Sequence, residues 1–260
     1  MLRALAVLAA ITVLAALGTG LALAERSQEG NLVASFQGRV APLKLPRHRP
    51  VPISIHLSGA LRTTDGSALP RIAAIEFDLA GGGGGLDTRG LPVCRLRRIR
   101  HTRDREALAA CGPALVGHGR IDAQAVIPGQ PPLIIHTHIL VFNGRGRGGA
   151  TALLLHAYAT RPPISVVIPF ALRHARGRFG TVLLASLPRR ELGPRPSIAR
   201  FSMTLSRRFS YRGSRRSFLA VSCPVPPRFT VGIFSLAQLE IRLGGGGGIA
   251  TEIVRTCRVR

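Results

Sequence analysis

The chain has 260 residues, 46% of them apolar and 18% charged, and a formal net charge of +24 from 36 basic and 12 acidic side chains. The apolar fraction excludes a disordered chain, and the 30 Gly and 19 Pro residues follow no triplet period, which excludes a collagen-like fibre. A chain of this length forms one large domain or two small ones. The excess of basic side chains favours a negatively charged partner.

Residues 1–24 have the pattern of an export signal, with a short basic start, a long apolar run and an Ala-x-Ala exit before Glu25. The apolar run is also just long enough to cross a bilayer, so an uncleaved membrane anchor is the alternative. In either case residues 25–260 are expected to work outside the cytoplasm, secreted or associated with the cell envelope. The chain enters a membrane only if the first segment remains attached.

The cysteines agree with that compartment, because all four follow the first segment and an even number in an exported chain favours disulfide bonds. Three pairings are possible, of which sequence proximity favours Cys94–Cys111 and Cys223–Cys257. Each of these bonds would close a loop worth roughly 3 kcal/mol of stability. A metal site is the weaker alternative, because no pair has the C-x-x-C spacing and no His follows at zinc-finger spacing.

Most of the body has the alternation of apolar and polar residues that is typical of strands with one buried face. Residues 25–50 are expected to be a linker with a short strand at 32–40, and only residues 102–110 have a helical pattern. The prediction is an all-β fold: an antiparallel β-sandwich, one large or two small, with one short helix. Further strands are expected at 53–62, 74–79, 120–127, 133–142, 150–160, 164–175, 181–187, 198–211, 217–222, 229–235 and 249–257.

The body divides into two β-rich regions, residues 51–160 and 161–260, the second of which is strongly basic. They form either one domain or two modules that separate near residues 160–163. One favoured cysteine pair in each region fits two modules, although no internal repeat relates them. Two runs of five glycines, at 81–85 and 244–248, are expected to be flexible connections between strands.

Short motifs with turn chemistry recur along nearly the whole body. They are 52–55 (PISI), 63–67 (TTDGS), 90–94 (GLPVC), 111–117 (C-x-x-ALVG), 141–144 (VFNG) and 177–181 (GRFGT). With these motifs the chain resembles a functionally uncharacterised family of exported, β-rich proteins from GC-rich bacteria. The resemblance implies export and a β-rich fold, and it carries over no functional residue.

Three histidines form the sharpest candidate for a catalytic or metal site. His136 and His138 share one face of an expected strand, and His156 is in the next strand. A hairpin that turns around 145–147 would place His156 opposite His136 and bring the three imidazoles together. Such a cluster can hold zinc with an open position that activates water, and no other cofactor is indicated. The alternative is three polar side chains on the wet face of a hairpin, since a small change of register would separate them.

Two further motifs have simpler structural explanations. Residues 143–149 contain the letters G-x-G-x-x-G, but a strand pattern follows where dinucleotide binding requires a helix. This Arg/Gly loop is instead expected to be a hairpin turn that can touch a polyanion. Glu76 and Asp78 share a strand face, where a carboxylate pair could serve glycoside hydrolysis or simply face solvent. No nucleophile elbow, phosphate loop or zinc-protease motif is present in the sequence, which lowers the expectation of an enzyme.

The positive charge is unevenly distributed. Residues 25–122 carry 15 basic and 9 acidic side chains, whereas residues 123–260 carry 20 basic and 3 acidic ones. Unpaired guanidinium groups repel one another unless anions neutralise them, and they pair well with phosphate and carboxylate. The alternative is a solvated basic surface that keeps the protein soluble. The candidate polyanion-binding residues are Arg97, Arg98, Arg100, Arg145, Arg147, Arg207, Arg208, Arg212, Arg215 and Arg216.

The sequence therefore favours an exported, non-enzymatic protein that binds an anionic polysaccharide, a teichoic-type polymer or lipid headgroups. Specific nucleic-acid binding is not expected, because only two Tyr and no Trp are available to stack on bases. The alternative function is a metal-dependent extracellular enzyme that uses His136, His138 and His156. A structural module without a ligand of its own is the third hypothesis.

Overall fold

The computed structural model of the chain describes residues 25–80, 84–126, 130–187 and 197–260. The expected signal segment, residues 1–24, lies outside these ranges. Strands dominate the described residues and the helices are short, so the all-β prediction is confirmed. No helix in the described ranges is long and apolar enough to span a membrane.

Fourteen of the described strands belong to one sheet, in which neighbours are antiparallel except for two short parallel pairs, β8 with β10 and β3 with β19. In sheet order the strands are β1 (Glu25–Glu29), β2 (Leu32–Ala41), β5 (Ser54–Thr63), β14 (Ser197–Leu205), β9 (Leu115–Ala125), β10 (Leu133–Arg145), β11 (Thr151–Thr160), β12 (Pro163–His174), β13 (Phe179–Ser186), β6 (Ile72–Ala80), β18 (Val231–Leu243), β19 (Gly248–Val259) and β3 (Lys44–Leu45), with β8 (Cys94–Arg95) beside β10.

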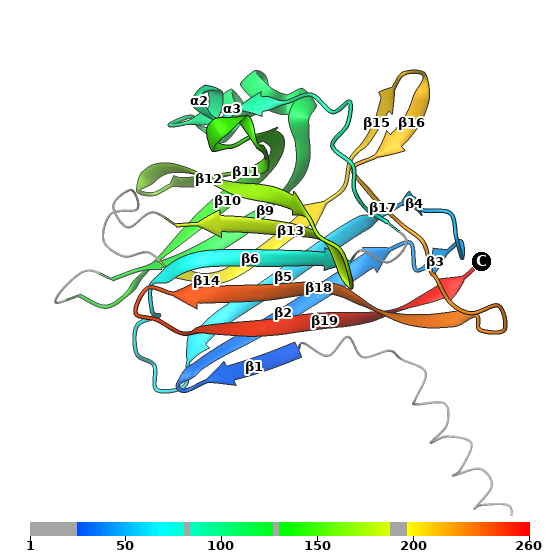
Figure 1. Ribbon diagram of the computed structural model, residues 1–260. Coiled ribbons are helices and arrows are strands. Elements are labelled where there is room, and N and C mark those ends of the chain that lie inside the picture. The colour runs from blue at the N-terminus through cyan, green and yellow to red at the C-terminus, as the bar shows by residue number, and fades with distance from the viewer. Residues whose placement is uncertain (1–24, 81–83, 127–129, 188–196) are drawn as a thin grey trace, which may run out of the picture.

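This sheet curls over so that its two halves pack face to face (Figure 1). Phe77 on β6 lies 6.1 Å from Phe36 on β2, 5.9 Å from Phe201 on β14 and 6.0 Å from Phe170 on β12, measured between ring centroids. These strands are not neighbours in the sheet, so the rings meet across the interior. Tilted and edge-on aromatic pairs of this kind add to the free energy of ordinary apolar burial. The predicted sandwich is therefore built from one continuous sheet.

The two ends of the curled sheet meet at β1, β2 and β19, where side chains replace strand pairing. The Arg255 Nε–H donates to the carbonyl of Gly38 at 2.7 Å, and the Val254 backbone N–H donates to a Glu25 carboxylate oxygen at 2.9 Å. Arg255 also forms an ion pair with Glu25. These contacts satisfy polar groups at edges that would otherwise be free to pair with another chain.

The expected division of the body differs from the structure in two places. Residues 25–41, expected as a linker with one strand, form β1 and β2 of the main sheet, and Phe36 is fully buried. Residues 160–163, the candidate boundary in the two-module alternative, are the tight turn between β11 and β12, where Thr160 pairs with Pro163. One hydrophobic core runs through both regions of the chain.

Two short elements extend the strand pattern beyond the main sheet. The strand expected at 198–211 is broken after Leu205, and its second part forms a hairpin of β15 (Arg208–Tyr211) and β16 (Ser214–Ser217). A separate small sheet contains β4 (Val51–Pro52), β17 (Leu219–Val221) and β7 (Gly85–Leu86).

A small helical cap covers the outer face of β10 and β11 at one end of the sheet. It contains α2 (Leu96–Ile99), which the sequence pattern did not predict, then α3 (Asp104–Cys111) and the 3-10 turn η2 (Gly112–Ala114). The predicted helix thus begins two residues later, where the Glu106 carboxylate accepts the Arg103 backbone N–H at 2.8 Å. Its buried residues form a second, smaller core against Phe142 and Leu154.

Both favoured disulfides are present. Cys94–Cys111 ties the start of the cap to its end, and Cys223–Cys257 ties the segment after β17 to β19. All four sulfurs are buried, and no cysteine is free. Two disulfides are consistent with an oxidising, extracytoplasmic environment.

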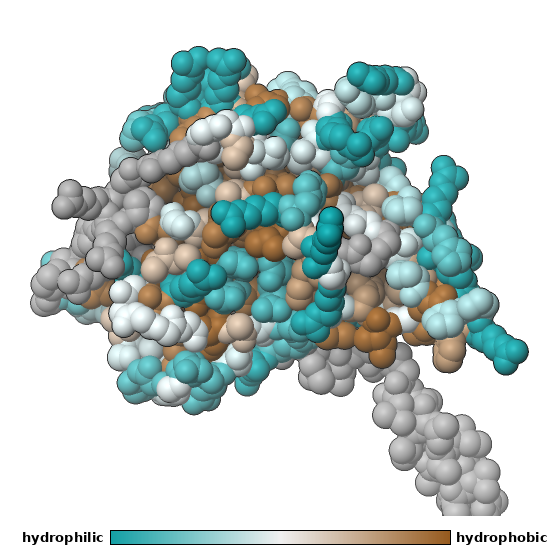
Figure 2. Space-filling model, in the orientation of Figure 1, coloured by the Kyte–Doolittle hydropathy of each residue, from teal (hydrophilic) through white to brown (hydrophobic). Residues whose placement is uncertain are grey.

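On β6 and β18 the apolar side chains point into the core and the polar ones point outward. Ile75, Phe77 and Leu79 are buried, whereas Glu76 and Asp78 lie on the outer face beside the polar residues of β18. Figure 2 views this face and shows hydrophilic residues gathered over β6 and β18. The alternation of the sequence thus sets which face of the sheet meets water.

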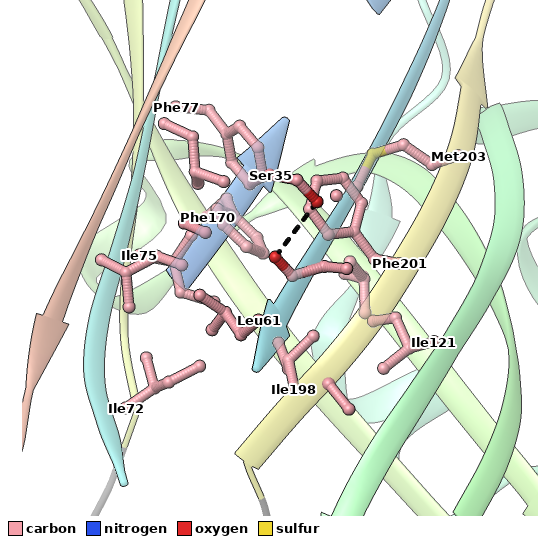
Figure 3. A pocket seen from close by; sticks show the side chains of 17 residues that line it. Ser35, Leu61, Ile72, Ile75, Phe77, Ile121, Phe170, Ile198, Phe201 and Met203 are labelled. Carbon is pink, nitrogen blue, oxygen red and sulfur yellow. Dashed lines mark hydrogen bonds between the residues drawn. The ribbon is translucent and has the colours of Figure 1, made fainter. Parts of the chain in front are cut away.

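The interior holds an apolar cavity of about 40 Å³ beside the aromatic cluster (Figure 3). Its lining is apolar apart from Ser35, whose hydroxyl donates to the carbonyl of Ala60 at 3.5 Å. A cavity of this size has room for only a few water molecules, and an apolar lining gives them few hydrogen-bond partners. The inside of the sheet is therefore core, and a functional site must be sought on its outer surface.

Candidate functional site

The outer face of six neighbouring strands, β2, β5, β14, β9, β10 and β11, is polar. Strand register places one residue from each of these strands in a row, because directly paired residues point to the same side of a sheet. The row spans about 24 Å at the usual spacing between strands of about 4.8 Å. Its members are Gln37, Ser58, Ser202, Arg120, His138 and Tyr158.

A second row runs beside the first and adds charge to the same face. Its members are Ser35, Ala60, Arg200, Asp122 and His136. The two rows form the floor of an open groove of about 760 Å³. A hollow of about 450 Å³ between α3 and the sheet shares His136, His138 and Thr160 with it. We call this continuous depression the polar groove.

In the polar groove two aspartates contact histidines, and the two arginines of its floor have no acidic partner among the described side chains. The imidazole Nδ1 of His136 lies 2.7 Å from Asp122 Oδ1, and that of His138 lies 3.5 Å from Asp104 Oδ2. Arg120 and Arg200 are exposed, and neither forms an ion pair with any described side chain. Their guanidinium groups are therefore available to carboxylate or phosphate oxygens of a ligand.

His156 lies under the cap rather than in the groove. It is fully buried, with Nε2 2.9 Å from the carbonyl oxygen of Thr102 and Nδ1 3.6 Å from Asp104 Oδ1. Because a carbonyl oxygen only accepts hydrogen bonds, Nε2 carries a proton. Asp104 thus faces one histidine in the groove and one beneath the cap, and the three side chains fasten α3 to β10 and β11.

The same site has a superficial likeness to a Ser-His-Asp arrangement. The Ser165 hydroxyl lies 3.4 Å from His156 Nε2, on the side of the ring away from Asp104. A general base needs a free lone pair aimed at the nucleophile, but Nε2 holds its proton for the Thr102 carbonyl. The arrangement therefore stabilises the fold, and it is not set up for hydrolysis.

The histidine cluster predicted from the sequence differs from the structure. The β10–β11 hairpin pairs His156 with Leu140 and not with His136. The turn lies two residues later than expected, at the 3-10 turn η3 (Arg147–Gly149), where Gly148 and Gly149 supply the positive φ angles. This shift moves His156 by four positions along β10 and under the cap. Within the described ranges no group of three or more His, Cys, Asp or Glu side chains is placed to hold a metal ion.

The candidate arginines lie in two groups at one end of the sheet, which we call the basic end. Strands β10 and β14 run in the same direction and finish there, and Figure 1 shows the cap and the β15–β16 hairpin at this end. The side chain of Arg147 lies outside the described residues. The remaining candidates are distributed between the cap with its neighbouring strand end (Arg97, Arg98, Arg100 and Arg145) and the hairpin region (Arg207, Arg208, Arg212, Arg215 and Arg216).

The hairpin at the basic end is held by the loop before β8. Arg216 donates to Asp87 Oδ2 at 2.8 Å, and its guanidinium lies 5.5 Å from the ring centre of Tyr211. Gly90 passes so close beneath this ring that a side chain there would collide with it. Partial burial raises the pKa of Asp87, but hydrogen bonds from the Arg89 backbone N–H and from Arg216 outweigh it and hold the pKa below its ordinary value.

Comparisons with protein-family models, with curated proteins and with solved structures found no match to this chain. The site must therefore be interpreted from its own chemistry. Sequence reasoning did not identify Arg120, Arg200 or Asp104 as site residues. No sequence signal gives the order of strands in the sheet, and that order is what brings these side chains together.

Proposed function

We propose that the protein is an exported, non-enzymatic binding protein for anionic polymers of the cell envelope, and that it binds them in the polar groove and at the basic end. The observation that carries the proposal is that most of these guanidinium groups have no acidic partner within the protein. Among the candidate arginines with described side chains, only Arg216 forms an ion pair. Arg120 and Arg200 in the groove have no carboxylate partner among the described side chains either.

The shape of the polar groove favours a chain-like ligand over a small ion. A row of about 24 Å offers amide, hydroxyl, imidazole and guanidinium groups at regular intervals between strands. A polymer that carries both hydroxyl groups and phosphate or carboxylate groups can bond to each of them in turn. The net charge of +24 adds long-range attraction, which raises the rate of encounter with such a polymer.

The binding role is also favoured over catalysis by the chemistry of the histidines. His156 is buried and committed to Thr102, while His136 and His138 each contact a different carboxylate. Export is supported by the two disulfides, which persist in oxidising compartments outside the cytoplasm.

Chromatography on a phosphate-bearing cellulose matrix tests the proposal. The protein is expected to bind at low salt and to elute as ionic strength rises, because screening weakens contacts between exposed charges. The variant R208Q/R212Q/R215Q removes three exposed arginines of the basic end and should elute at clearly lower salt. The matched variant R62Q/R161Q/R242Q removes three exposed arginines near the opposite end of the sheet and should elute close to the parent protein. Equal shifts for the two variants would mean that only net charge matters, and the proposal would fail.

A further inference from the structure

An amphipathic ribbon lies outside the polar groove, on strands that contain none of the candidate arginines of the basic end. It consists of residues 229–235, at the start of β18, and residues 254–260, at the end of β19, and we call it the C-terminal ribbon. One face of this ribbon exposes apolar side chains that a soluble protein normally buries. The exposed fractions are 61% for Phe229, 48% for Val231, 76% for Ile233 and 42% for Val254.

Basic side chains flank this apolar stripe. Strand register places Val231 beside Arg258, and Arg258 beside Lys44 of β3, so that one apolar residue and two cations follow one another across three strands. Arg260 lies just beyond the same end of β19. The nearby carboxylate of Glu25 is already paired with Arg255. The stripe thus has cations along one side.

The ribbon is held in shape from beneath. Gly232 packs against the Cys223–Cys257 disulfide, and a side chain at this position would collide with Val225. The Arg47 guanidinium donates to the carbonyls of Val225, Pro226, Pro227 and Phe229, which fixes the loop that carries the Phe229 ring. The apolar side chains are therefore presented by a rigid scaffold, and binding would require little ordering of the backbone.

We propose that the C-terminal ribbon docks on the surface of an anionic lipid bilayer, with Phe229, Val231 and Ile233 inserted at the interface and Arg258 and Lys44 among the headgroups. Apolar side chains beside basic ones are what such an interface binds. A polysaccharide offers no apolar phase for these side chains. A second copy of the chain would bring Arg258 and Lys44 against like charges, in a protein whose net charge is already +24. This inference does not depend on polymer binding in the polar groove.

A tryptophan probe tests the docking locally, because the native chain contains no Trp. The variant F229W is mixed with vesicles of phosphatidylcholine alone or with an equal share of phosphatidylglycerol. Its emission should shift to shorter wavelength, and brominated acyl chains should quench it, only with the anionic vesicles. The control I164W places the probe at an exposed residue of β12, which does not neighbour β18, β19 or β3, and should show neither effect. Both variants share residues 1–24, so any contribution from that segment is common to them.

Sedimentation with the same vesicles gives the second arm of the test. R258Q/K44Q should weaken binding to the anionic vesicles by roughly 25-fold, because each cation near such a surface contributes about fivefold. R62Q/R161Q, which removes the same charge near the opposite end of the sheet, should bind nearly as the parent does. An emission wavelength of F229W that does not change on addition of the anionic vesicles would overturn the proposal. So would soluble polyphosphate that reproduces the blue shift, because it would show capture of any polyanion without insertion.

Discussion

The two outer faces of the curled sheet use arginine differently. On the face formed by β13, β6, β18 and β19, the Arg242 guanidinium lies 3.2 Å from Glu76 and 2.9 Å from Glu240. On the same face Arg178 donates to Glu252 at 2.8 Å. Arg178 and Arg242 are thus paired within the protein, whereas Arg258, in the C-terminal ribbon at the edge of this face, has no ion pair among the described side chains.

The polar groove on the other side has the opposite arrangement. Asp122 and Asp104 contact histidines there, Glu106 accepts the Arg103 backbone N–H, and Arg120 and Arg200 have no acidic partner among the described side chains. A guanidinium that already holds a carboxylate has part of its charge neutralised and fewer N–H groups free for a ligand, whereas an unpaired one offers all of them. The contrast teaches that the pairing of arginines, rather than their number, separates a structural face from a binding face.

The largest expected effect tests whether the cap supports the polar groove. Replacing buried His156 with Ala removes the ring beneath α3 and leaves the Thr102 carbonyl without its hydrogen-bond donor. The free energy of unfolding should fall by about 3 kcal/mol, from the cavity and the unsatisfied carbonyl together. Urea unfolding with the disulfides intact measures this change. E252Q, which breaks an exposed ion pair on the opposite face, should lower it by less than about 1 kcal/mol. Equal losses would show that the cap does not depend on His156.

The second prediction compares how arginines on the two outer faces of the sheet contribute to ligand affinity. R120Q/R200Q removes the two unpaired groove arginines and should weaken binding of an oligogalacturonate by about twentyfold, since charge-assisted hydrogen bonds are the strong ones. R178Q/R242Q removes the same charge from the opposite face and should leave the affinity close to that of the parent. Titration calorimetry at low salt measures both. If the second variant loses as much affinity as the first, the groove is not the site.

Much of this fold could be predicted from local sequence patterns. Alternation along each strand identifies its buried face, because the side-chain period of a strand is two, and it places Ile75 and Phe77 inside and Glu76 outside. Sequence proximity likewise favours the two disulfides that the structure contains. These features depend on neighbours along the chain, so one sequence is enough to find them.

The candidate site could not be predicted in the same way, because it depends on contacts between distant segments. Residues 143–149 contain four glycines, and the use of Gly148 and Gly149 for the turn moves His156 under the cap. The position of Arg200 beside Asp122 requires β14 to pair with β9, although β14 lies some 75 positions further along the chain. Alternation identifies the face of each strand and does not identify its neighbour.

The smallest expected change in stability concerns Asp78, an acidic residue without a partner on the outer face of β13, β6, β18 and β19, which we call the paired face. Partial burial, and then the charges of Glu76 and Glu240, raise the pKa of Asp78 above its ordinary value, and its Oδ1 is buried without a hydrogen bond. The folded state therefore holds this proton more tightly than the unfolded state, so stability falls as pH rises above about 4. D78N removes the charge and should raise the free energy of unfolding at pH 7, by less than about 1 kcal/mol because solvent screens the site.

The pH dependence of this gain distinguishes it from a simple packing change. The difference between D78N and the parent should vanish below about pH 4, where both side chains are neutral. Asp87 provides the opposite case, because its pKa is held below the ordinary value and its contribution to stability is lost as pH falls. D87N should therefore destabilise at neutral pH and converge with the parent in acid. A gain for D78N that persists unchanged at pH 3 would show that its charge is not the cause, and that the paired face tolerates an isolated carboxylate without loss of stability.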